Sequence, residues 1–204
     1  MRGRFITLEG GEGAGKSTQA ALLEAALRAQ GREVLRTREP GGAPGSEALR
    51  GLLLTSGIDW SPLAETMLHV AARAEHVAKA IGPALAAGVW VICDRFADST
   101  LAYQGYGQGF DRAGIVTLGS LIDVTPDLTL VLTVSPAVAL ARRTERGQVA
   151  DRYEKLPADF HAKVAAGFAA IAAENPSRCV TINADGTREA THQAIMAAIA
   201  AKFP

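Results

Sequence analysis

The chain has 204 residues, and its 21 Lys and Arg balance 21 Asp and Glu, so the formal net charge at pH 7 is zero. Proteins that hold DNA or RNA by neutralising phosphates normally carry a basic excess, so this balance argues against a nucleic-acid partner. Hydrophobic residues make up 48% and charged residues 21%, which is typical of a globular chain and excludes a disordered one. This length predicts one domain spanning residues 1–204.

Cysteine usage and apolar runs bear on the compartment. Cys93 and Cys179 lie far apart among apolar residues, which predicts small buried side chains rather than a disulfide framework or a zinc site. The first residues lack the apolar run of a signal peptide, and no later stretch reaches the apolar length of a membrane span. We therefore expect a cytoplasmic protein without a membrane partner.

Strand and helix patterns alternate along the chain. Short β-rich or apolar runs predict strands over residues 5–9, 32–37, 89–93, 128–134 and 179–182. Helical spacing predicts helices over residues 17–30, 46–54, 61–81, 112–122, 136–145, 158–173 and 188–201. Pro83 is expected to kink or end the third of these helices.

This alternation predicts an α/β fold, because strands separated by helices form right-handed crossovers and a parallel sheet. The predicted architecture is a three-layer sandwich with a five-stranded parallel sheet and helices on both faces. Ligands of such sheets bind beyond the carboxyl ends of the strands. The loops that follow Glu9, Thr37, Cys93 and Val134 should therefore converge on one site.

A phosphate-binding loop follows the first predicted strand. Residues 10–17 read Gly-Gly-Glu-Gly-Ala-Gly-Lys-Ser and fit the pattern G-x-x-x-x-G-K-[ST]. Glycines let backbone N–H groups wrap a phosphate, and the helix that begins next adds its positive end. Lys16 can reach the β- and γ-phosphates, and the Ser17 hydroxyl can ligate Mg²⁺. The loop predicts binding of a nucleoside triphosphate.

The loop alone does not distinguish a GTPase switch, an ATPase motor and a small-molecule kinase. The chain contains no Asn-Lys-x-Asp run, which is typical of guanine-specific GTPases. Where motors usually carry Asp-Glu, the third predicted strand ends in Cys93-Asp94-Arg95-Phe96. An arginine beside that carboxylate suits a second phosphate rather than activation of water. This favours a kinase over a regulatory ATPase, and the presence of Lys16, Ser17, Asp94 and Arg95 argues against an inactive paralogue.

The arginines fit a phosphorylated acceptor. A phosphate monoester has a second pKa of about 6, so at neutral pH it is largely dianionic and needs charge cancellation and in-line placement rather than a general base. The chain has only four histidines. Arg38 and Arg95 follow predicted strands, and Arg73 lies in the predicted 61–81 helix. A cluster at and beyond the end of the 136–145 helix contains Arg142, Arg143, Arg146 and Arg152.

That cluster lies in residues 142–157, which include Gly147. Beside a phosphate loop, the segment is interpreted as a short mobile lid that closes arginines over the transferred phosphoryl group. The alternative is the solvated end of a helix followed by an exposed loop.

Several longer runs resemble bacterial thymidylate kinase, a nucleoside monophosphate kinase family of P-loop proteins. They are Thr-Arg-Glu-Pro-Gly-Gly at 37–42, Asp-Arg-Phe at 94–96, Ser-Thr-Leu-Ala-Tyr-Gln at 99–104 and Pro-Asp-Leu-Thr-Leu at 126–130. The similarity runs through essentially the whole chain. It implies phosphorylation of dTMP to dTDP in dTTP biosynthesis, with ATP and dTMP as partners and Mg²⁺ as cofactor, by in-line transfer without a general base.

The resemblance also implies a homodimer packed through helices. The apolar stripe of the 61–81 helix could serve that interface or belong to the core, and periodicity does not separate the two. Its members are Leu63, Met67, Val70, Ala71, Ala74, Val77, Ala78 and Ile81.

Carried over residue by residue, the resemblance implies three sets of functional residues on the ATP side. The catalytic residues are Lys16, Arg95, Arg146 and Glu12. The ATP-binding residues are Gly10, Gly11, Glu12, Gly13, Ala14, Gly15, Lys16, Ser17, Thr18 and Arg143, and the metal ligands are Ser17 and Asp94. Arg146 is the best match to the lid arginine, and residues 183–187 are placed near adenine by fold analogy.

The resemblance implies a dTMP pocket made of Glu12, Arg38, Pro40, His69, Arg73, Arg95, Ser99, Thr100, Tyr103 and Gln104. Arg95 and Arg73 are expected to clamp the acceptor phosphate, and Arg73 also reads thymine together with Thr100 and Gln104. Glu12 is expected near the 3′-hydroxyl, with an exposed loop acid as the alternative. Tyr103 is expected to press on the deoxyribose, with a surface aromatic residue as the alternative.

His69 departs from the family, which usually has Phe there to stack on thymine. An imidazole also has a flat face, so stacking can survive, but its area is smaller and protonation would change its character. A structural histidine is the alternative.

Overall fold

The computed structural model describes residues 2–55, 57–147 and 152–204, except for the side chain of Arg146. Within these residues five parallel strands form one sheet in the order β2-β3-β1-β4-β5. The strands are β1 (Phe5–Glu9), β2 (Val34–Arg38), β3 (Trp90–Asp94), β4 (Leu128–Thr133) and β5 (Cys179–Asn183). The predicted α/β fold with a five-stranded parallel sheet is confirmed.

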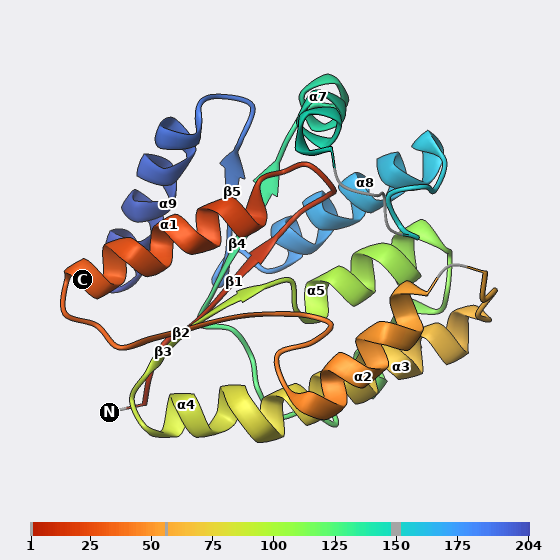
Figure 1. Ribbon diagram of the computed structural model, residues 1–204, viewed down its shortest axis with the longest axis horizontal. Helices are drawn as coiled ribbons and strands as arrows, with labels where there is room; N and C mark the ends of the chain where they lie inside the picture. Colours follow the sequence, from red (N-terminus) through yellow and green to blue (C-terminus); the bar gives the residue numbers. More distant parts are fainter. Residues whose placement is uncertain (1, 56, 148–151) are drawn as a thin grey trace.

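Helices cover both faces of the sheet (Figure 1). One face carries α1 (Lys16–Ala29) and α9 (Arg188–Lys202). The other carries α3 (Pro62–His76), the π-helix η1 (Val77–Ile81), α4 (Gly82–Ala86), the π-helix η2 (Leu101–Gly107) and α8 (Ala158–Glu174). The remaining helices are α2 (Pro44–Leu54), α5 (Ala97–Thr100), α6 (Arg112–Gly119) and α7 (Pro136–Arg146).

The alternation of side chains along β1 explains this layering. Ile6 and Leu8 belong to the core beneath α1 and α9, whereas Phe5 belongs to the core beneath η1 and α4. All three side chains are fully buried. A strand with apolar residues on both faces is stable only between two helical layers.

The carboxyl ends of the strands meet at one edge. Leu8 and Arg38 both pair with Asp94 in the sheet, and the Arg95 N–H donates to the Leu8 carbonyl at 2.9 Å. The loops after β1, β2 and β3 therefore lie side by side. The chain termini approach each other on the opposite side of the molecule (Figure 1), where the Arg4 guanidinium lies 5.2 Å from the Phe203 ring.

The third predicted helix does not end at Pro83. It passes from α3 through the π-helix η1 into α4, and the Gly82 N–H bonds the Val77 carbonyl. Pro83 therefore lies directly after a π-helical turn inside a continuous helix. Proline has no N–H to continue the hydrogen-bond ladder, and the wider π-turn before it is a local adjustment of that ladder. The chain also forms α5 and η2 over residues 97–107, where no helix is predicted from the sequence.

Cys93 and Cys179 lie in β3 and β5, and both are buried free thiols as expected. Among the described residues, no helix combines the length and apolar character needed to cross a membrane.

Candidate active site

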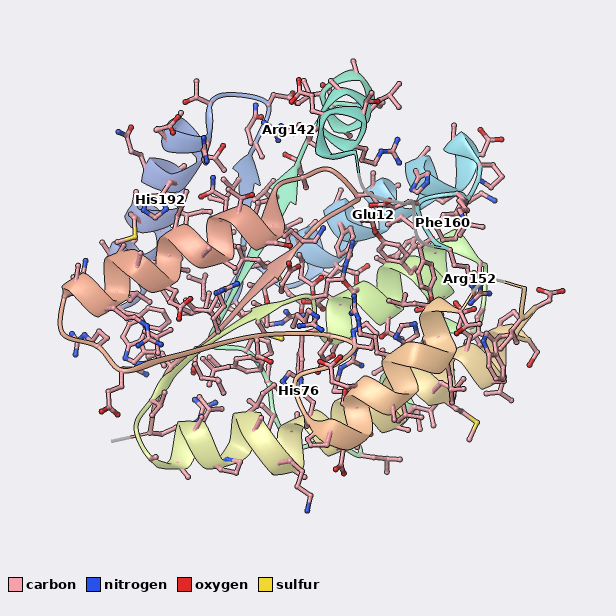
Figure 2. The ribbon with its side chains drawn as sticks, in the orientation of Figure 1. Glu12, His76, Arg142, Arg152, Phe160 and His192 are labelled. Carbon is pink, nitrogen blue, oxygen red and sulfur yellow. The ribbon has the colours of Figure 1, made fainter. Side chains whose placement is uncertain are left out.

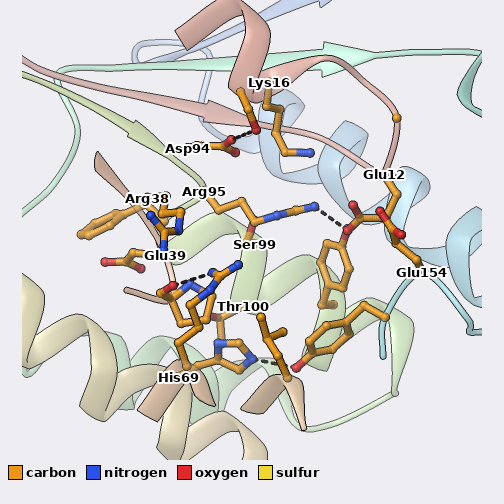
Figure 3. Close-up of a pocket in the computed structure, with 18 of the residues that line it drawn as sticks. Glu12, Lys16, Arg38, Glu39, His69, Asp94, Arg95, Ser99, Thr100 and Glu154 are labelled. Carbon is orange, nitrogen blue, oxygen red and sulfur yellow. Dashed lines mark hydrogen bonds and ion pairs between the residues drawn. The ribbon is translucent and has the colours of Figure 1, made fainter. Parts of the chain in front are cut away.

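A cleft of about 840 Å³ opens at the carboxyl edge of the sheet (Figure 3). Its walls come from the phosphate loop, the segment after β2, one face of α3, the β3–η2 region and α7. These are the loops that the parallel-sheet argument brings together. The cleft is where predicted donor and acceptor residues meet.

The phosphate loop turns tightly between β1 and α1. Gly10 has φ 135°, and a Cβ there would lie 2.3 Å from the Leu132 carbonyl oxygen, so only glycine fits. The buried Lys16 ammonium donates to the carbonyls of Gly10 at 3.0 Å and Gly11 at 2.8 Å. Burial, together with the charge of Arg95, lowers the pKa of Lys16 to about 8. Lys16 is thus held over the loop where phosphates would bind.

Ser17 and Asp94, the predicted metal ligands, contact each other. The Ser17 hydroxyl donates to the Asp94 carboxylate across the start of α1 and the end of β3 (Figure 3). A hydroxyl and a carboxylate are the oxygen donors that Mg²⁺ prefers. No cluster of three His, Cys, Asp or Glu occurs in the part of the chain that the structure describes. The pair therefore fits a Mg²⁺ ion that takes its other ligands from phosphates and water.

Arg95 spans the floor of the cleft. Its φ of 69° lies in the left-handed region, which is unusual for a side chain of this size. Its guanidinium donates to the Gly10 carbonyl at 3.1 Å and forms an ion pair with Glu12. Both of these contacts lie in the phosphate loop, whereas a third bond to the Ser99 hydroxyl at 3.3 Å and the Tyr103 ring at 4.9 Å connect Arg95 to the predicted dTMP pocket.

The alternative interpretations of Glu12 and Tyr103, an exposed loop acid and a surface aromatic residue, are wrong, because neither side chain lies at the surface. The Glu12 side chain is 13% exposed and Tyr103 is 5% exposed. The Tyr103 hydroxyl donates to Glu12 at 2.7 Å. Burial raises the pKa of Glu12, but the charges of Arg95 and Lys16 outweigh it and bring the pKa to about 2. Glu12 is therefore an ionised acceptor held between Arg95 and Tyr103.

Arg73 is buried on the far wall of the cleft. Its Nε donates to Glu39 at 2.8 Å and its Nη2 donates to the Thr100 hydroxyl at 2.9 Å. Glu39 also bonds His76 at 3.1 Å. Sequence reasoning missed Glu39 and His76, although Glu39 stands inside the Thr-Arg-Glu-Pro-Gly-Gly run and an acid among site arginines was a usable signal.

His69 lies on α3 and lines the same wall. Its Nε2 is 2.8 Å from the Tyr153 hydroxyl, which donates to Glu65 at 2.9 Å. Because the single hydroxyl proton points to Glu65, His69 must carry its own proton on Nε2. Burial and the charge of Arg73 lower the pKa of His69 to about 4. At neutral pH the ring is therefore uncharged. Tyr153 and Glu65 were not predicted.

The opposite end of the cleft involves α7. Arg142 reaches from α7 to the loop after β5 (Figure 2) and donates to the carbonyls of Ala184 at 2.7 Å and Gly186 at 3.1 Å. This is the segment expected near adenine. Sequence reasoning had placed Arg142 only in the arginine cluster.

The predicted lid, residues 142–157, is described in part. Arg146 is the last residue of α7, and its side chain lies outside the described residues, as do residues 148–151. Arg152 lies near α3, where its guanidinium pairs with Glu65 at 2.6 Å. One member of the cluster therefore belongs to the acceptor wall.

Most predicted site residues line the cleft. They are Glu12, Gly13, Gly15, Lys16, Ser17, Thr18, Arg38, Pro40, His69, Arg73, Asp94, Arg95, Ser99, Thr100, Tyr103, Gln104 and Arg143. Gly10 and Gly11 lie beside it through their bonds to Lys16, and Ala14 is buried beneath the loop. Arg38 also pairs with Glu47 at 3.2 Å. Arg50 and Leu54 of α2 line the cleft and were not predicted.

The phosphate loop, the Ser17–Asp94 pair and a second arginine-lined wall share one cleft on a five-stranded parallel sheet. These features define a P-loop protein of the nucleotide kinase class. Comparison with known proteins gives the family. The thymidylate kinase family model matches residues 8–195.

Thymidylate kinases are also similar to this chain over nearly its full length. The one from Gluconobacter oxydans is 52% identical over 97% of this chain and 94% of its own. The one from Rhizorhabdus wittichii is 50% identical over 100% of both. The crystal structure of thymidylate kinase from Ehrlichia chaffeensis, at 38% identity, covers 98% of this chain and 99% of its own with a TM-score of 0.80. The chain belongs to the thymidylate kinase family, which confirms the predicted resemblance and the predicted enzyme class, dTMP kinase.

Proposed function

We propose that this chain transfers the γ-phosphoryl group of MgATP to dTMP, giving dTDP, by in-line displacement without a general base. The observation that carries the proposal is the position of Arg95. Its guanidinium touches the phosphate loop at Gly10 and Glu12. On the acceptor side it donates to the Ser99 hydroxyl at 3.3 Å and lies 4.9 Å from the centre of the Tyr103 ring, within the same cleft. A cation between two phosphate sites can hold donor and acceptor in line and cancel the charge between them.

On the donor side, backbone N–H groups of the phosphate loop and Lys16 would bind the phosphates, and Ser17 and Asp94 would hold Mg²⁺. Bound Mg²⁺ would neutralise the charge of the phosphate oxygens. Arg143 and Arg146 would approach from residues 142–157, acting as a lid within a single domain of residues 1–204. Arg142, bonded to Ala184 and Gly186, supports an adenine pocket in that corner.

On the acceptor side, the residues divide by the part of dTMP they would contact. Arg73, Thr100, Gln104 and His69 would contact thymine, and the neutral His69 ring suits stacking on a neutral base. Tyr103 and Glu12 would face the deoxyribose, and Arg38, Pro40, Arg95 and Ser99 would surround the phosphate. A dianionic acceptor needs no base. Glu12, with a pKa of about 2, is in any case a poor one.

The test is ADP formation from MgATP with dTMP, dUMP, dGMP, dCMP, AMP or no acceptor. We expect turnover chiefly with dTMP. Replacing the Arg95 charge in Arg95→Ala should lower kcat by about 10²–10³-fold. Arg28→Ala, which removes an exposed arginine of α1 paired with Glu24, is the matched control and should leave kcat unchanged. Equal ADP formation without acceptor would contradict the proposal and favour an ATPase, and preference for another monophosphate would overturn the base-pocket assignment.

We also propose a homodimer, supported by the exposure of one part of the apolar stripe. Leu63 and Met67 are 49% and 53% exposed on α3, and Ala71, Ala74 and Ala78 continue that exposed line. Val70 and Ile81 of the same stripe are buried. The stripe therefore divides between core and surface, and its surface part suits a second copy of the chain.

A cytoplasmic location is part of the same proposal. Both cysteines are free and buried in the sheet, on β3 and β5. Free thiols persist in a reducing compartment.

A further inference from the structure

Glu65 is a fully buried carboxylate on α3 that the proposed reaction does not use. Its Oε1 accepts three hydrogen bonds, from Gln104 Nε2 at 2.8 Å, from Gln108 Nε2 at 2.7 Å and from the Tyr153 hydroxyl at 2.9 Å. Its Oε2 forms the ion pair with Arg152 at 2.6 Å. A buried charge with this many partners is held in one geometry.

The ionisation state of Glu65 decides how its partners are oriented. Burial raises its pKa, but hydrogen bonds from Gln104 and Tyr153 and the charge of Arg152 outweigh it, so the pKa is lowered. An ionised carboxylate only accepts hydrogen bonds. Gln104 must therefore turn its amide NH₂ toward Glu65. The Gln104 carbonyl oxygen then remains available to accept a hydrogen bond in the cleft that Gln104 lines.

We propose that Glu65 is a positioning residue that sets selectivity for the nucleobase of the monophosphate substrate. It locks the Gln104 side chain so that the Gln104 carbonyl oxygen, which can only accept a hydrogen bond, faces that base. This inference rests on the proposed function. The polar edge of thymine offers one donor, N3–H, beside the O4 acceptor, whereas cytosine offers an N3 acceptor beside an amino donor. A fixed carbonyl pairs with N3–H of thymine and faces the lone pair of cytosine N3.

Glu65 orients a second base-side group through Tyr153. The Tyr153 hydroxyl donates to Glu65 and accepts from His69 Nε2, so the same carboxylate sets the proton position on His69. One buried group thus fixes the orientation of Gln104 and the tautomer of His69. If Glu65 could also donate a hydrogen bond, both the Gln104 orientation and the His69 tautomer should become variable.

The test compares dTMP with 5-methyl-dCMP, which keeps the methyl group and phosphate but reverses the donor and acceptor. Dissociation constants are measured by titration calorimetry for the wild type, Glu65→Gln, Glu65→Asp and Gln108→Met. We expect the wild type to prefer dTMP and Glu65→Gln to lose about tenfold or more of that preference, because a glutamine amide can also donate to Gln104. Glu65→Asp keeps a carboxylate and should retain the preference. Gln108→Met removes a different donor to the same oxygen and should also retain it.

The outcomes separate the two claims. If the wild type binds dTMP and Glu65→Gln weakens both ligands by the same factor, Glu65 is only structural and the inference is overturned. If Glu65→Gln does not fold, the affinities of the wild type test the inference. Equal affinities of the wild type for dTMP and 5-methyl-dCMP would overturn the claim that Gln104 is held with its carbonyl oxygen toward the base. Failure of the wild type to bind dTMP at all would refute the proposed function, and this inference with it.

Discussion

At the scale of single residues, Glu9 and His69 have pKa values displaced in opposite directions within the same pH range. Glu9 ends β1 and accepts bonds from the Phe96 N–H at 2.7 Å and from the Ser99 hydroxyl. Burial, and then the charge of Asp98, raises the pKa of Glu9 from 4.5 to about 7. Burial lowers the pKa of His69 from 6.5 to about 4. Both groups are therefore neutral in the folded protein between about pH 4 and pH 7.

The two shifts have opposite consequences for stability. The stabilisation from Glu9 is complete below pH 4.5 and is lost as pH rises through 7, because the unfolded state releases its proton first. The stabilisation from His69 is complete above pH 6.5 and is lost as pH falls through 4, because the unfolded state takes up a proton first. Between pH 4.5 and 6.5 the unfolding free energy therefore falls with rising pH through Glu9 and rises through His69, and the two effects offset each other.

Single replacements should therefore tilt the stability profile in opposite ways. Relative to the wild type, the unfolding free energy of His69→Phe should fall as pH rises from 4.5 to 6.5, and that of Glu9→Gln should rise. Each slope should change by at most about 1.4 kcal/mol per pH unit. Urea titrations at several pH values measure this, with the exposed Glu33→Gln as control. If the unfolding free energies of both variants changed with pH in parallel with the wild type, the opposite pKa shifts of Glu9 and His69 would be contradicted.

At the scale of elements, the contact between η2 and α8 holds Tyr103 and Gln104 in the acceptor wall. Two glycines allow the close approach. A Cβ at Gly107 would lie 2.6 Å from the Phe160 ring, and one at Gly167 would lie 2.7 Å from Tyr106 Cγ. Since Cγ is anchored near the backbone, it cannot swing aside as the end of a flexible chain could.

Gly167→Ala should therefore destabilise the protein by about 1–3 kcal/mol through overpacking. It should also weaken dTMP binding, because η2 would be displaced with Gln104 on it. Urea unfolding and dTMP titration measure the two effects. Gly119→Ala is the matched control, because a Cβ at that residue of α6 meets nothing within 4 Å. Equal stability of the two variants would show that the helices can separate without penalty.

The helix over residues 97–107 shows why elements can escape sequence analysis. Ser99, Thr100, Gly105 and Gly107 are poor helix formers, so propensity argues against a helix there. The helix forms because its buried residues Ala102 and Tyr103 pack against α8. Tertiary packing overrides local preference here, and a single sequence carries no sign of it.

At the scale of the whole molecule, the helix next to α3 also carries exposed apolar side chains. Val116 on α6 is 60% exposed and Leu121, which follows it, is 79% exposed. α6 packs against α3. With zero net charge at pH 7, no general repulsion opposes the approach of a second copy.

Met67→Glu should convert the proposed dimer to a monomer, because it places a charge in the centre of an apolar interface. Sedimentation velocity at micromolar concentration measures the mass. Leu140→Glu, which changes a 58% exposed leucine on α7, is the matched control and should remain dimeric. A wild type that sediments as a monomer would refute the dimer proposal.

The features that depend on residues close together in the chain could be predicted without the structure. The phosphate loop is eight consecutive residues, and its glycine spacing already implies a phosphate cradle between a strand and a helix. Alternating strand and helix patterns determined the parallel sheet, and the sheet determined the edge at which loops converge. The resemblance then pointed to the residues of an acceptor pocket.

The partners that orient those residues become visible only in the folded chain. Arg73 bonds Glu39, 34 positions away, and Tyr153 bonds Glu65, 88 positions away. It also decided which part of the α3 stripe is core, because burial depends on what other elements cover. Local patterns are set by bonds between near neighbours, whereas the orientation of a buried amide or imidazole is set by contacts that exist only once distant segments have packed together.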